Sequence, residues 1–355
     1  MKLKVGIFTT NSVDKIHPRI EMQLRILNDE GYDVELIRSQ KNKEGFLFEL
    51  LNLISLKYFK KRSIANFKKR IIEFDIVHVY DLQLLPLVKF AKGLNKKVIY
   101  ETLDDNVHLH FYALSKKIPG LKTFEKSIIK HFSNFEKKYA SKYCDSVIVN
   151  SPNLLVNFEK ANLIYYSSNL EGIKTEDYSS SKETRFIYIG KLSEGKGARE
   201  YKRLIDDFSV PMIFIGNTSD NVAEELSNDI NVDYRGSFDS IGLKQELNSL
   251  IKKYNLIGLS IIIPENKSYA LQEANKDIDY LCVQIPFIGN TRKPTYEKIK
   301  EGVGVLFSDE KGVNKLIYNK EYSYDKCRSE AKELYRPYSS HNFKSIYLKL
   351  VKSLY

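Results

Sequence analysis

The chain has 355 residues, a length that corresponds to about two domains at roughly 150 residues each. Hydrophobic residues make up 43% and charged residues 28%, which is typical of a globular protein and excludes a disordered or fibrous chain. The longest apolar runs, such as residues 257–264, fall well short of the ~20 residues that a membrane-spanning helix needs. The first residues run directly into a strand-like segment and show no secretion signal. Three widely spaced cysteines offer neither a disulfide framework nor a paired metal motif, so a cytoplasmic location is expected.

Positive charge is concentrated in the first half of the chain. Residues 1–170 carry 28 Lys and Arg against 18 Asp and Glu, a net charge of +10, whereas the remainder carries 28 against 27. Residues 57–70, KYFKKRSIANFKKR, contain no acid. Such a half indicates an anionic partner, which can be a nucleic acid, an anionic lipid or a phosphorylated substrate. General solubility of a lysine-rich protein is the alternative.

Short apolar strands alternate with amphipathic helices along the first half of the chain. Gly31 ends the first of these helices. Strands separated by helices favour a parallel sheet with right-handed crossovers. The expected elements are a strand at 4–9, a helix at 19–30, strands at 33–37 and 75–79, a helix at 84–93, a strand at 97–100, a helix at 121–141 and a strand at 146–149.

The polar, serine-rich stretch 166–185 interrupts this rhythm and is interpreted as a connection between domains. The rhythm then restarts, which predicts two doubly wound α/β domains that face each other across a cleft. Ligands of such sheets bind beyond the carboxyl ends of the strands, at helix N-termini. The expected elements of the second half are strands at 186–189, 212–216, 230–235, 258–263, 285–289 and 304–307, and helices at 199–206 and 243–254.

The strongest local signal is residues 186–197, FIYIGKLSEGKG. An apolar strand ends at Gly190, and Lys191 and Lys196 follow in a loop of small and polar residues that opens a helix. Glycine allows close approach of the backbone, the helix offers free N–H groups, and the lysines neutralise negative charge, so the segment suits a diphosphate. A plain surface turn with solvated lysines is the alternative. The first strand is followed by neither G-x-G-x-x-G nor a P-loop, which argues against a simple dehydrogenase or a P-loop kinase.

This segment resembles the G-R-L-x-x-x-K-G loop that begins the C-terminal domain of family four glycosyltransferases (group 1 type), which are retaining enzymes of GT-B architecture. Lys191 stands where that family usually has arginine. Residues 13–37, 74–104 and 135–151 resemble other blocks of the family in the right order. The resemblance implies two Rossmann-like parallel-sheet domains: an acceptor-side domain at 1–168 and a nucleotide-sugar domain at 169–340. It also implies that a last helix, 341–355, packs back on the first domain.

The family's acidic signature, E-x7-E ahead of G-x-P-V, fits this chain in two registers. Glu265 and Glu273 have the required spacing. Asp279 instead lies seven residues before Pro286, where the family places its second acid, and Lys276 precedes it by one helical turn on the same face. In that register the first acid is absent, because position 271 is leucine. A surface helix with scattered acids is the further alternative.

Other site residues follow from the resemblance. Glu297 resembles an acid near the donor sugar, while Asp81, Asp104 and Arg19 would orient the acceptor. Leu103 replaces a histidine of the family. His108 and His110 have no Cys or carboxylate cluster to complete a metal site, so no metal is expected.

A long apolar segment, residues 45–59, is followed by a basic one. Such a pair can lie on an anionic membrane surface, and relatives often use lipid-linked acceptors at the cytoplasmic face, which favours a peripheral position at the inner face of the cell membrane. A buried helix with a basic edge is the alternative.

The resemblance therefore implies a retaining glycosyltransferase that moves a sugar, hexosyl or related, from a nucleotide-sugar donor to a cell-surface polysaccharide or lipid-linked glycan acceptor. The donor is a substrate, and no cofactor is expected. The alternatives are a non-catalytic sugar-nucleotide-binding homologue and a sugar-nucleotide epimerase of the same architecture. No nucleic-acid partner is expected, because the sequence contains no recognition module. The implied donor-side residues are Lys191, Lys196, Asp279 and Glu273 for catalysis, and Gly190, Lys276, Glu297 and Glu265 for binding.

Overall fold

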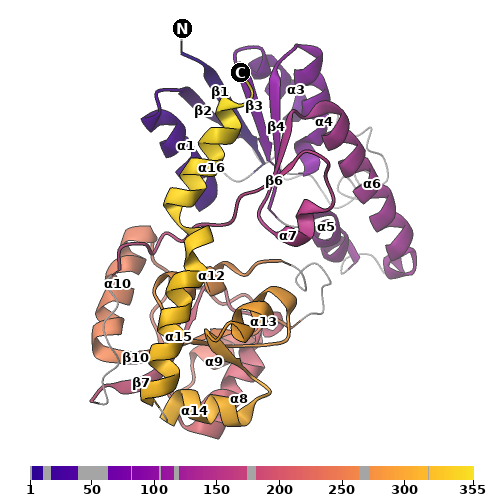
Figure 1. Cartoon of the computed structure of the whole chain (residues 1–355). Coiled ribbons are helices and arrows are strands. Elements are labelled where there is room, and N and C mark those ends of the chain that lie inside the picture. Colours follow the sequence, from indigo (N-terminus) through magenta and orange to yellow (C-terminus); the bar gives the residue numbers. More distant parts are fainter. Residues whose placement is uncertain are drawn as a thin grey trace. The chain divides into compact units, whose positions relative to one another are not determined.

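The computed structural model divides the chain into two units, each built on one sheet (Figure 1). The first unit comprises Met1–Tyr165 with Phe343–Tyr355, and the second comprises Tyr166–Asn342. The first boundary expected from the sequence is 168, and the division between the two compact units lies after Tyr165. Ser168 therefore counts with the second unit, where its hydroxyl donates to Asp279. The structure describes residues 2–10, 17–38, 63–80, 82–103, 105–115, 120–173, 181–263, 272–318 and 320–355.

The first unit has a parallel sheet in the order β2-β1-β3-β4-β5-β6. Its strands are β1 (Lys4–Thr9), β2 (Asp33–Arg38), β3 (Ile76–Tyr80), β4 (Lys97–Thr102), β5 (Ser146–Val149) and β6 (Ala161–Leu163). Its helices are α1 (Pro18–Asp29), α3 (Ser63–Ile71), α4 (Leu85–Gly93), α5 (Asn106–Ser115), α6 (Glu125–Tyr143), α7 (Pro152–Leu155) and, from Phe343 onward, α16 (Ser340–Lys352).

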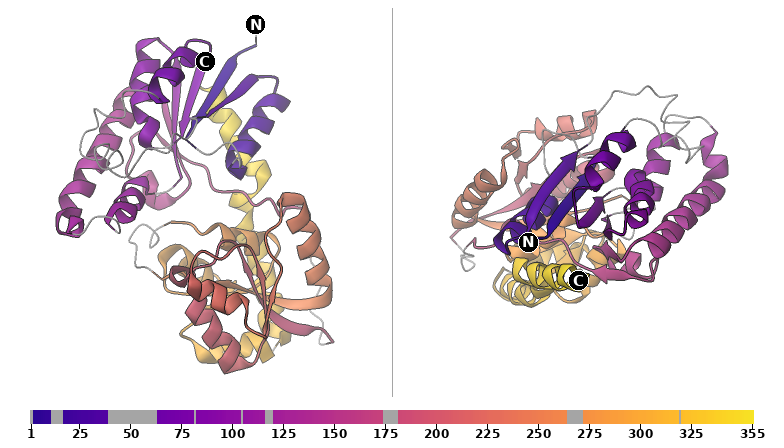
Figure 2. Two further views of the ribbon diagram at one scale, coloured as in Figure 1. Left: turned by 180° about the vertical axis from the view of Figure 1, so that it is seen from behind. Right: turned by 90° about the horizontal axis from the view of Figure 1, so that it is seen from above.

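Both faces of this sheet are apolar, and each has its own layer of helices. Alternate residues of β3 enter opposite cores: Ile76 packs with α1 and α16, whereas Val77 packs with α3, α4 and α6. A strand that is buried on both faces is mostly apolar, and β3 (IVHVY) follows this pattern apart from the buried His78. Figures 1 and 2 show α16 on the same side of the sheet as α1, with both chain termini close together.

The second unit has a parallel sheet in the order β12-β11-β10-β7-β8-β9. Its strands are β7 (Glu183–Ile189), β8 (Met212–Ile215), β9 (Val232–Tyr234), β10 (Tyr254–Ser260), β11 (Phe287–Gly289) and β12 (Gly304–Leu306). Its helices are α8 (Ala198–Phe208), α9 (Asn221–Ser227), α10 (Ser240–Lys253), α12 (Asn275–Cys282), α13 (Lys293–Lys300), α14 (Glu310–Tyr318) and α15 (Lys320–Tyr335). Helices α8, α9 and α14 contribute to the core on one face, and α10, α12 and α15 to the core on the other.

One predicted strand is displaced. The sequence analysis expects a strand at 258–263, but β10 begins at Tyr254 and ends at Ser260. Tyr254 pairs with Glu183 of β7, so the chain enters the sheet immediately after the last turn of α10. The apolar residues 261–263 lie beyond the end of the strand, in a loop that belongs to the candidate site described below.

Local sequence determines where several helices begin. The Asp239 carboxylate accepts from the Gly242 N–H at 2.7 Å and caps α10, and Asp220 caps α9 in the same way. Pro18 is the first residue of α1, a position where proline needs no N–H donor. Gln284, two residues after the end of α12, takes a positive φ of 53°. This conformation is one that glycine adopts without strain.

A buried ion pair ties the first unit together. Arg19 of α1 forms an ion pair with Glu101 of β4, and its guanidinium also donates to the carbonyls of Ile164 and Tyr165 at 2.9 Å each. His78 Nε2 lies 2.9 Å from the second Glu101 oxygen. Burial alone would raise the pKa of Glu101, but the Arg19 charge and the contact with His78 outweigh it and lower the pKa to about 2.

Glu101→Gln is therefore expected to lower the free energy of unfolding by about 3 kcal/mol, because it leaves Arg19 buried without a counter-charge. Since the folded pKa lies below the ordinary value of 4.5, the stabilisation is present above that pH and is lost as the pH falls toward 2. Urea unfolding at several pH values measures both effects. Glu35→Gln, which removes an exposed partner of Arg70, is the control and should change stability by less than about 1 kcal/mol. Equal effects of the two variants would contradict this account.

Candidate functional site

The strand order of the second unit places a candidate site at the carboxyl ends of β7 and β10. The two strands lie side by side, with Ile187 opposite Gly258, yet they are separated in sequence by β8 and β9. The order of the sheet therefore reverses between them, and doubly wound sheets bind their ligands at such a point. Two loops meet there: residues 190–197 after β7 and residues 261–263 after β10.

Glycines allow these loops to approach closely. Gly190 has a φ of +124°, and no atom lies within 4 Å of the place where a Cβ would stand, so the space beside its Cα is open, while its N–H donates to the carbonyl of Ile215 at 2.8 Å. Gly197 has a φ of +89°, and a Cβ there would lie 2.8 Å from the carbonyl oxygen of Ile261. The Ile263 N–H donates to the carbonyl of Gly195 at 3.0 Å. The first loop is thus packed against the second, and only glycine fits at position 197.

Tyr201 of α8 holds residues 261–263, the loop after β10, through two hydrogen bonds. Its hydroxyl accepts from the Ile261 N–H at 2.9 Å and lies 3.1 Å from the Ile261 carbonyl, to which it donates. Tyr201 is fully buried, so these bonds are shielded from water. Helix α8 begins at Ala198, directly after Gly197, which brings its N-terminus to the same edge of the sheet.

A chain of hydrogen bonds joins α12 to residues 190–197, the loop after β7 that we call the glycine loop. Lys276, the second residue of α12, donates to the hydroxyl of Tyr188 at 3.0 Å, and its ammonium lies 4.1 Å from the centre of that ring. The Tyr188 hydroxyl in turn donates to the carbonyl of Lys191 at 3.0 Å. The sequence points to Lys191 and Lys276 separately, and the buried side chain of Tyr188 connects them.

Three lysines lie at this edge of the sheet, and their charges act on one another. Burial, and then the charge of Lys191, lowers the pKa of Lys196. Burial, and then the charge of Lys196, lowers the pKa of Lys276 well below its ordinary value. Among the residues that the structure describes, no carboxylate forms an ion pair with any of the three. We call these side chains the lysine cluster. Such a cluster attracts a ligand with several negative charges.

The next residue of α12, Asp277, anchors the helix through a buried network that the sequence did not reveal. Asp277 is fully buried and accepts from Thr295 at 2.7 Å, from Arg292 at 3.1 Å and from the hydroxyl of Ser260. Arg292 also donates to the carbonyl of Gln272. These bonds hold the start of α12 against the end of β10, and thereby position Lys276.

The two acid registers have different surroundings. Asp279 lies one turn after Lys276, is half-buried and accepts from the Ser168 hydroxyl at 2.6 Å. Burial and the charge of Asp277 raise its pKa to about 7 despite that bond. Glu273 is instead paired with Lys298 at 2.5 Å, and both side chains are nearly buried, with 7% and 6% exposed. Glu265 lies outside the described residues.

The remaining predicted residues are dispersed. Glu297 is exposed on α13. The donors of Arg19 are engaged within the first unit, and its side chain is only 2% exposed, so its expected contact with an acceptor stays an untested prediction. Asp81 and Asp104 lie outside the described residues, as does the apolar segment 45–59.

His108, one of the two histidines noted in the sequence, lies beside a carboxylate. His108 Nδ1 lies 2.6 Å from Asp105, a pair formed within one turn at the start of α5. No group of three or more His, Cys, Asp or Glu among the described residues could hold a metal ion. No described helix is both long and apolar enough to cross a bilayer.

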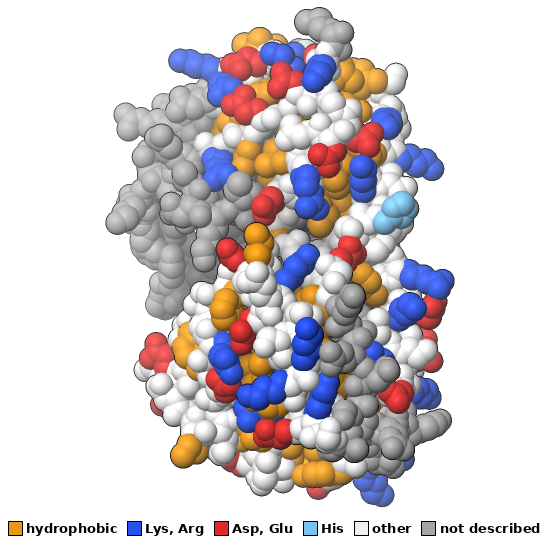
Figure 3. All heavy atoms as spheres, turned by 90° about the vertical axis from the view of Figure 1, so that its left-hand side faces the viewer, with side chains coloured by type: hydrophobic (Ala, Val, Ile, Leu, Met, Phe, Trp, Pro, Cys, Tyr) orange, Lys and Arg blue, Asp and Glu red, His pale blue; other side chains and the backbone are white. Residues whose placement is uncertain are grey.

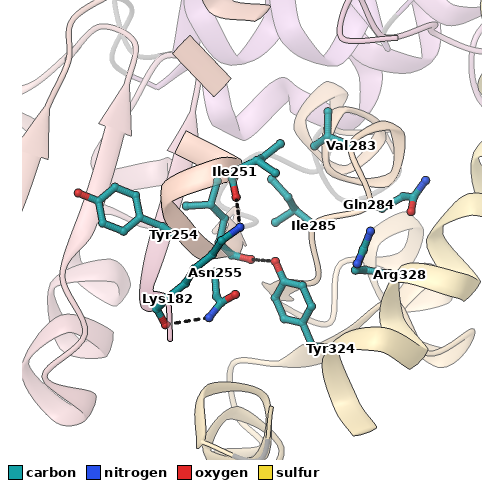
Figure 4. Close-up of a pocket in the computed structure, with 10 residues that line it drawn as sticks. Lys182, Ile251, Tyr254, Asn255, Val283, Gln284, Ile285, Tyr324 and Arg328 are labelled. Atoms are coloured by element: carbon teal, nitrogen blue, oxygen red, sulfur yellow. Dashed lines mark hydrogen bonds between the residues drawn. The ribbon is translucent and has the colours of Figure 1, made fainter. Parts of the chain in front are cut away.

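Cavities elsewhere lie at the opposite edges of the sheets. In the second unit, a cavity of about 10 Å³ beside the amino end of β10 has room for about one water molecule (Figure 4). Lys182 and Tyr324 donate there to backbone carbonyls at 3.1 Å each. In the first unit, an open polar hollow of about 450 Å³ lies where β4, β5 and β6 begin. Ligands of doubly wound sheets bind at the other edge, so neither is the candidate site.

Lys276→Met is expected to raise the free energy of unfolding of the ligand-free protein by about 1 kcal/mol, because it removes an amine that is buried beside another cation. The folded pKa of Lys276 is lowered, so its destabilising effect is complete below that pKa and disappears as the pH rises toward 10.5. The gain in stability should shrink accordingly. Lys252→Met, at an exposed position on α10, is the matched control and should change stability by less than about 0.5 kcal/mol. A loss of stability in Lys276→Met would show that the lysine is a structural contact.

No family model matches the sequence, and no curated protein matches it. Solved structures match the fold over the whole chain. HepE (Alr3699) of Anabaena, in complex with UDP and glucose, is 12% identical with a TM-score of 0.66 and covers 99% of this chain and 100% of its own. The lipopolysaccharide outer core galactosyltransferase WaaB in its apo form is 14% identical, with a TM-score of 0.60 and coverages of 98% and 99%.

MurG of Acinetobacter baumannii is also similar, with 12% identity, a TM-score of 0.52 and coverages of 98% and 99%. At these identities the likeness concerns the architecture. The two parallel sheets with helices on both faces, and the match over the whole chain, confirm the predicted fold: the protein has the GT-B fold.

Proposed function

We propose that the protein is a glycosyltransferase that takes its sugar from a nucleoside diphosphate donor. The observation that carries the proposal is the lysine cluster, three lysines that form no ion pair with a carboxylate among the described residues, beside the open space at Gly190. A diphosphate supplies the missing negative charge in a compact form. The similar structures support this choice, because HepE was solved with UDP and glucose, and WaaB is named a galactosyltransferase.

The lysine cluster would act when the glycosidic bond breaks. Negative charge then accumulates on the departing diphosphate, and ammonium groups that are already in place stabilise it more than they stabilise the intact donor. Lys191 and Lys196 approach from the glycine loop and Lys276 from the first turn of α12. The N-termini of α8 and α12 add partial positive charge. This assignment requires no metal ion.

Asp279 is the acid that we propose for the donor's ribose or sugar hydroxyls, with Glu297 as a second contact. Asp279 shares a helix face with Lys276, and its carboxyl oxygens accept hydrogen bonds. Glu273 is already neutralised by Lys298, which leaves it little capacity for a ligand. The register of Glu265 and Glu273 remains the alternative.

The finer features follow from the family resemblance and are proposals as well. They are retention of the anomeric configuration, transfer of a hexose or related sugar, and an acceptor that is a cell-surface polysaccharide or lipid-linked glycan. Asp81, Asp104 and Arg19 would orient the acceptor. Peripheral contact with the inner face of the membrane would involve the basic first half of the chain.

Nucleic-acid binding is not favoured by the surface of the second unit. Its charges nearly balance in the sequence, and on the face shown in Figure 3 the Lys and Arg side chains are interspersed with Asp and Glu. Nucleic-acid surfaces instead carry a basic patch or stripe.

Lys196→Met should lower kcat/KM for donor turnover by about 100-fold, because it removes one group that stabilises the departing diphosphate. It should also abolish the thermal stabilisation by the donor that is selected from UDP-, GDP-, ADP- and CDP-sugars. Lys252→Met, at the other end of the sheet, is the control and should keep both properties. Unchanged turnover in Lys196→Met would contradict the proposal.

The products separate the proposed transferase from its rivals. A non-catalytic homologue would bind a donor without transferring or hydrolysing it. An epimerase would convert the sugar nucleotide to an isomer in the absence of an acceptor. Chromatography of the products with and without acceptor distinguishes these outcomes.

The two acid registers predict opposite phenotypes. Asp279→Asn should raise KM for the donor by about tenfold, the effect of one lost hydrogen bond to a charged group, with little change in the free energy of unfolding. Glu273→Gln should lower the free energy of unfolding by about 3 kcal/mol, because Lys298 loses its buried partner. Steady-state kinetics and urea unfolding provide both measurements. A stable Glu273→Gln protein without turnover would support the Glu265 and Glu273 register instead.

A further inference from the structure

The excess positive charge of the first unit lies on one of its two helical layers. Helix α4 contacts both α3 and α6, and the three helices cover the same face of the sheet (Figure 1). Among the described residues of these helices, every exposed charged side chain is a lysine: Lys68, Lys69, Lys89, Lys126, Lys130, Lys138 and Lys142. We call these side chains the basic face.

The other layer of the same unit has balanced charges. Helix α1 exposes both Glu21 and Arg25. On α16, Lys344 and Lys352 each lie 3.3 Å from a carboxylate oxygen of Glu30. A lysine-rich composition that served only general solubility would place unbalanced charge on both layers. Its concentration on α3, α4 and α6 therefore favours an anionic partner of this one layer.

Helix α6 carries the longest part of the basic face. Its exposed side chains include no acid and no apolar residue, and they are Lys126, Ser127, Lys130, His131, Asn134, Lys138 and Lys142. The acids of the helix are not exposed: Glu125 is half-buried, and the buried Glu136 accepts from the hydroxyl of Tyr100 at 2.7 Å. At 1.5 Å per residue, the 19 residues of α6 extend over about 28 Å, so the positive charge forms a row rather than a single point.

The basic face continues from α6 onto α4 without a neutralising acid. Lys89 of α4 and Lys142 of α6 lie 5.9 Å and 5.4 Å from the centre of the same ring, that of Tyr143. The ion pairs that the described residues of these helices do form involve half-buried cations instead, Arg70 with Glu35 and Glu73, and Lys92 with Asp145. The exposed lysines are therefore available to an external anion.

We propose that the basic face binds an acceptor glycan that carries negative charges, carboxylate or phosphodiester groups, at intervals along its chain. This inference rests on the proposed function and narrows the class of its acceptor. A helix that connects parallel strands runs opposite to them, so α6 begins at the edge of the sheet where β4 ends and finishes where β5 begins. Ligands of doubly wound sheets bind at the edge where the strands end. A glycan whose reacting end lies at that edge can extend along the row of lysines.

The composition of α6 distinguishes this ligand from other polyanions. A helix that lies on an anionic membrane combines its cations with apolar residues that enter the bilayer, and α6 exposes none along its length. Proteins that bind single-stranded nucleic acid provide aromatic rings on which successive bases stack. Phe124 is exposed directly before α6, but it stands at one end of the row and cannot serve a series of bases. A charged glycan needs only cations at intervals, which α6 supplies.

Fluorescence anisotropy with labelled oligosaccharides tests the charge of the ligand. The protein should bind a galacturonate oligosaccharide, the carboxylate probe, or a poly(glycerol phosphate) chain, the phosphodiester probe, and the stronger of the two identifies the source of the charge. It should not bind a neutral maltooligosaccharide of the same length. Binding should weaken steeply with added salt, because released counterions drive it. Failure to bind either charged probe, or equal binding of the neutral one, would overturn the inference.

Variants of α6 locate the binding. The triple variant Lys126→Gln, Lys130→Gln and Lys138→Gln should weaken binding of the charged probe by about tenfold, since each exposed ion pair contributes modestly. Arginine at the same three positions should preserve binding, because the contact depends on charge. Thermal unfolding checks that both variants are folded. Unchanged binding in the glutamine variant would overturn the inference.

A matched control separates the basic face from net charge. Lys252→Gln, Lys311→Gln and Lys315→Gln remove three exposed lysines of the second unit and should leave binding unchanged. An equal loss in this control would overturn the inference, as would tighter binding of a single-stranded oligonucleotide or of phosphatidylglycerol vesicles than of both charged glycans. Donor turnover without charged-glycan binding contradicts the inference alone. Charged-glycan binding at α6 by a protein that turns over no donor supports the basic face and contradicts the proposed function.

Discussion

The function proposed for the second unit depends on one constraint, the mutual repulsion of the three lysines at the carboxyl end of β7. Folded proteins rarely keep partly buried cations together without a carboxylate that pairs with them. Here the charge of Asp277 favours the charged form of Lys276, but its carboxylate accepts from Arg292 and Thr295 instead. Asp277 and Arg292 neutralise each other, so the positive charge of the lysine cluster is not balanced by this network. That charge is available to an anionic ligand.

Three residues within one turn of α12 contact three different parts of the second unit. Lys276 reaches the glycine loop through Tyr188, Asp277 anchors the helix to β10, and Asp279 accepts from Ser168 in the segment that enters the second unit. Consecutive residues of a helix face different directions, so neighbouring positions can serve different partners. This explains why the acid signature is difficult to place from spacing alone: the chemistry of α12 depends on which face each residue occupies.

The alternation of strands and helices was predictable, because both sheets are buried on both faces and their strands read as short apolar runs. The predicted strands at Lys4–Thr9 and Ser146–Val149 have the observed bounds. The start of β10 was not predictable, because YNLI continues the apolar pattern of the preceding helix and only its pairing with β7 defines it as strand. Likewise, Gly190, Lys191 and Lys196 form a local motif, whereas the contact between Lys276 and Tyr188 joins residues 88 positions apart and appears only in the fold.

Arg19 of the first unit and Lys276 of the second differ in how their charges are balanced, and the difference indicates which of the two is functional. In the first unit the guanidinium of Arg19 meets Glu101 and two carbonyls, so its charge is balanced where it stands. In the second unit Lys276 donates to a phenol, and burial together with the charge of Lys196 outweighs the charge of Asp277, which lowers its pKa and destabilises the folded state. Structural stability alone would favour an apolar side chain or an added carboxylate at that position. An arrangement that opposes stability in the empty protein becomes favourable once an anion binds, and we infer that the cluster is maintained for that ligand.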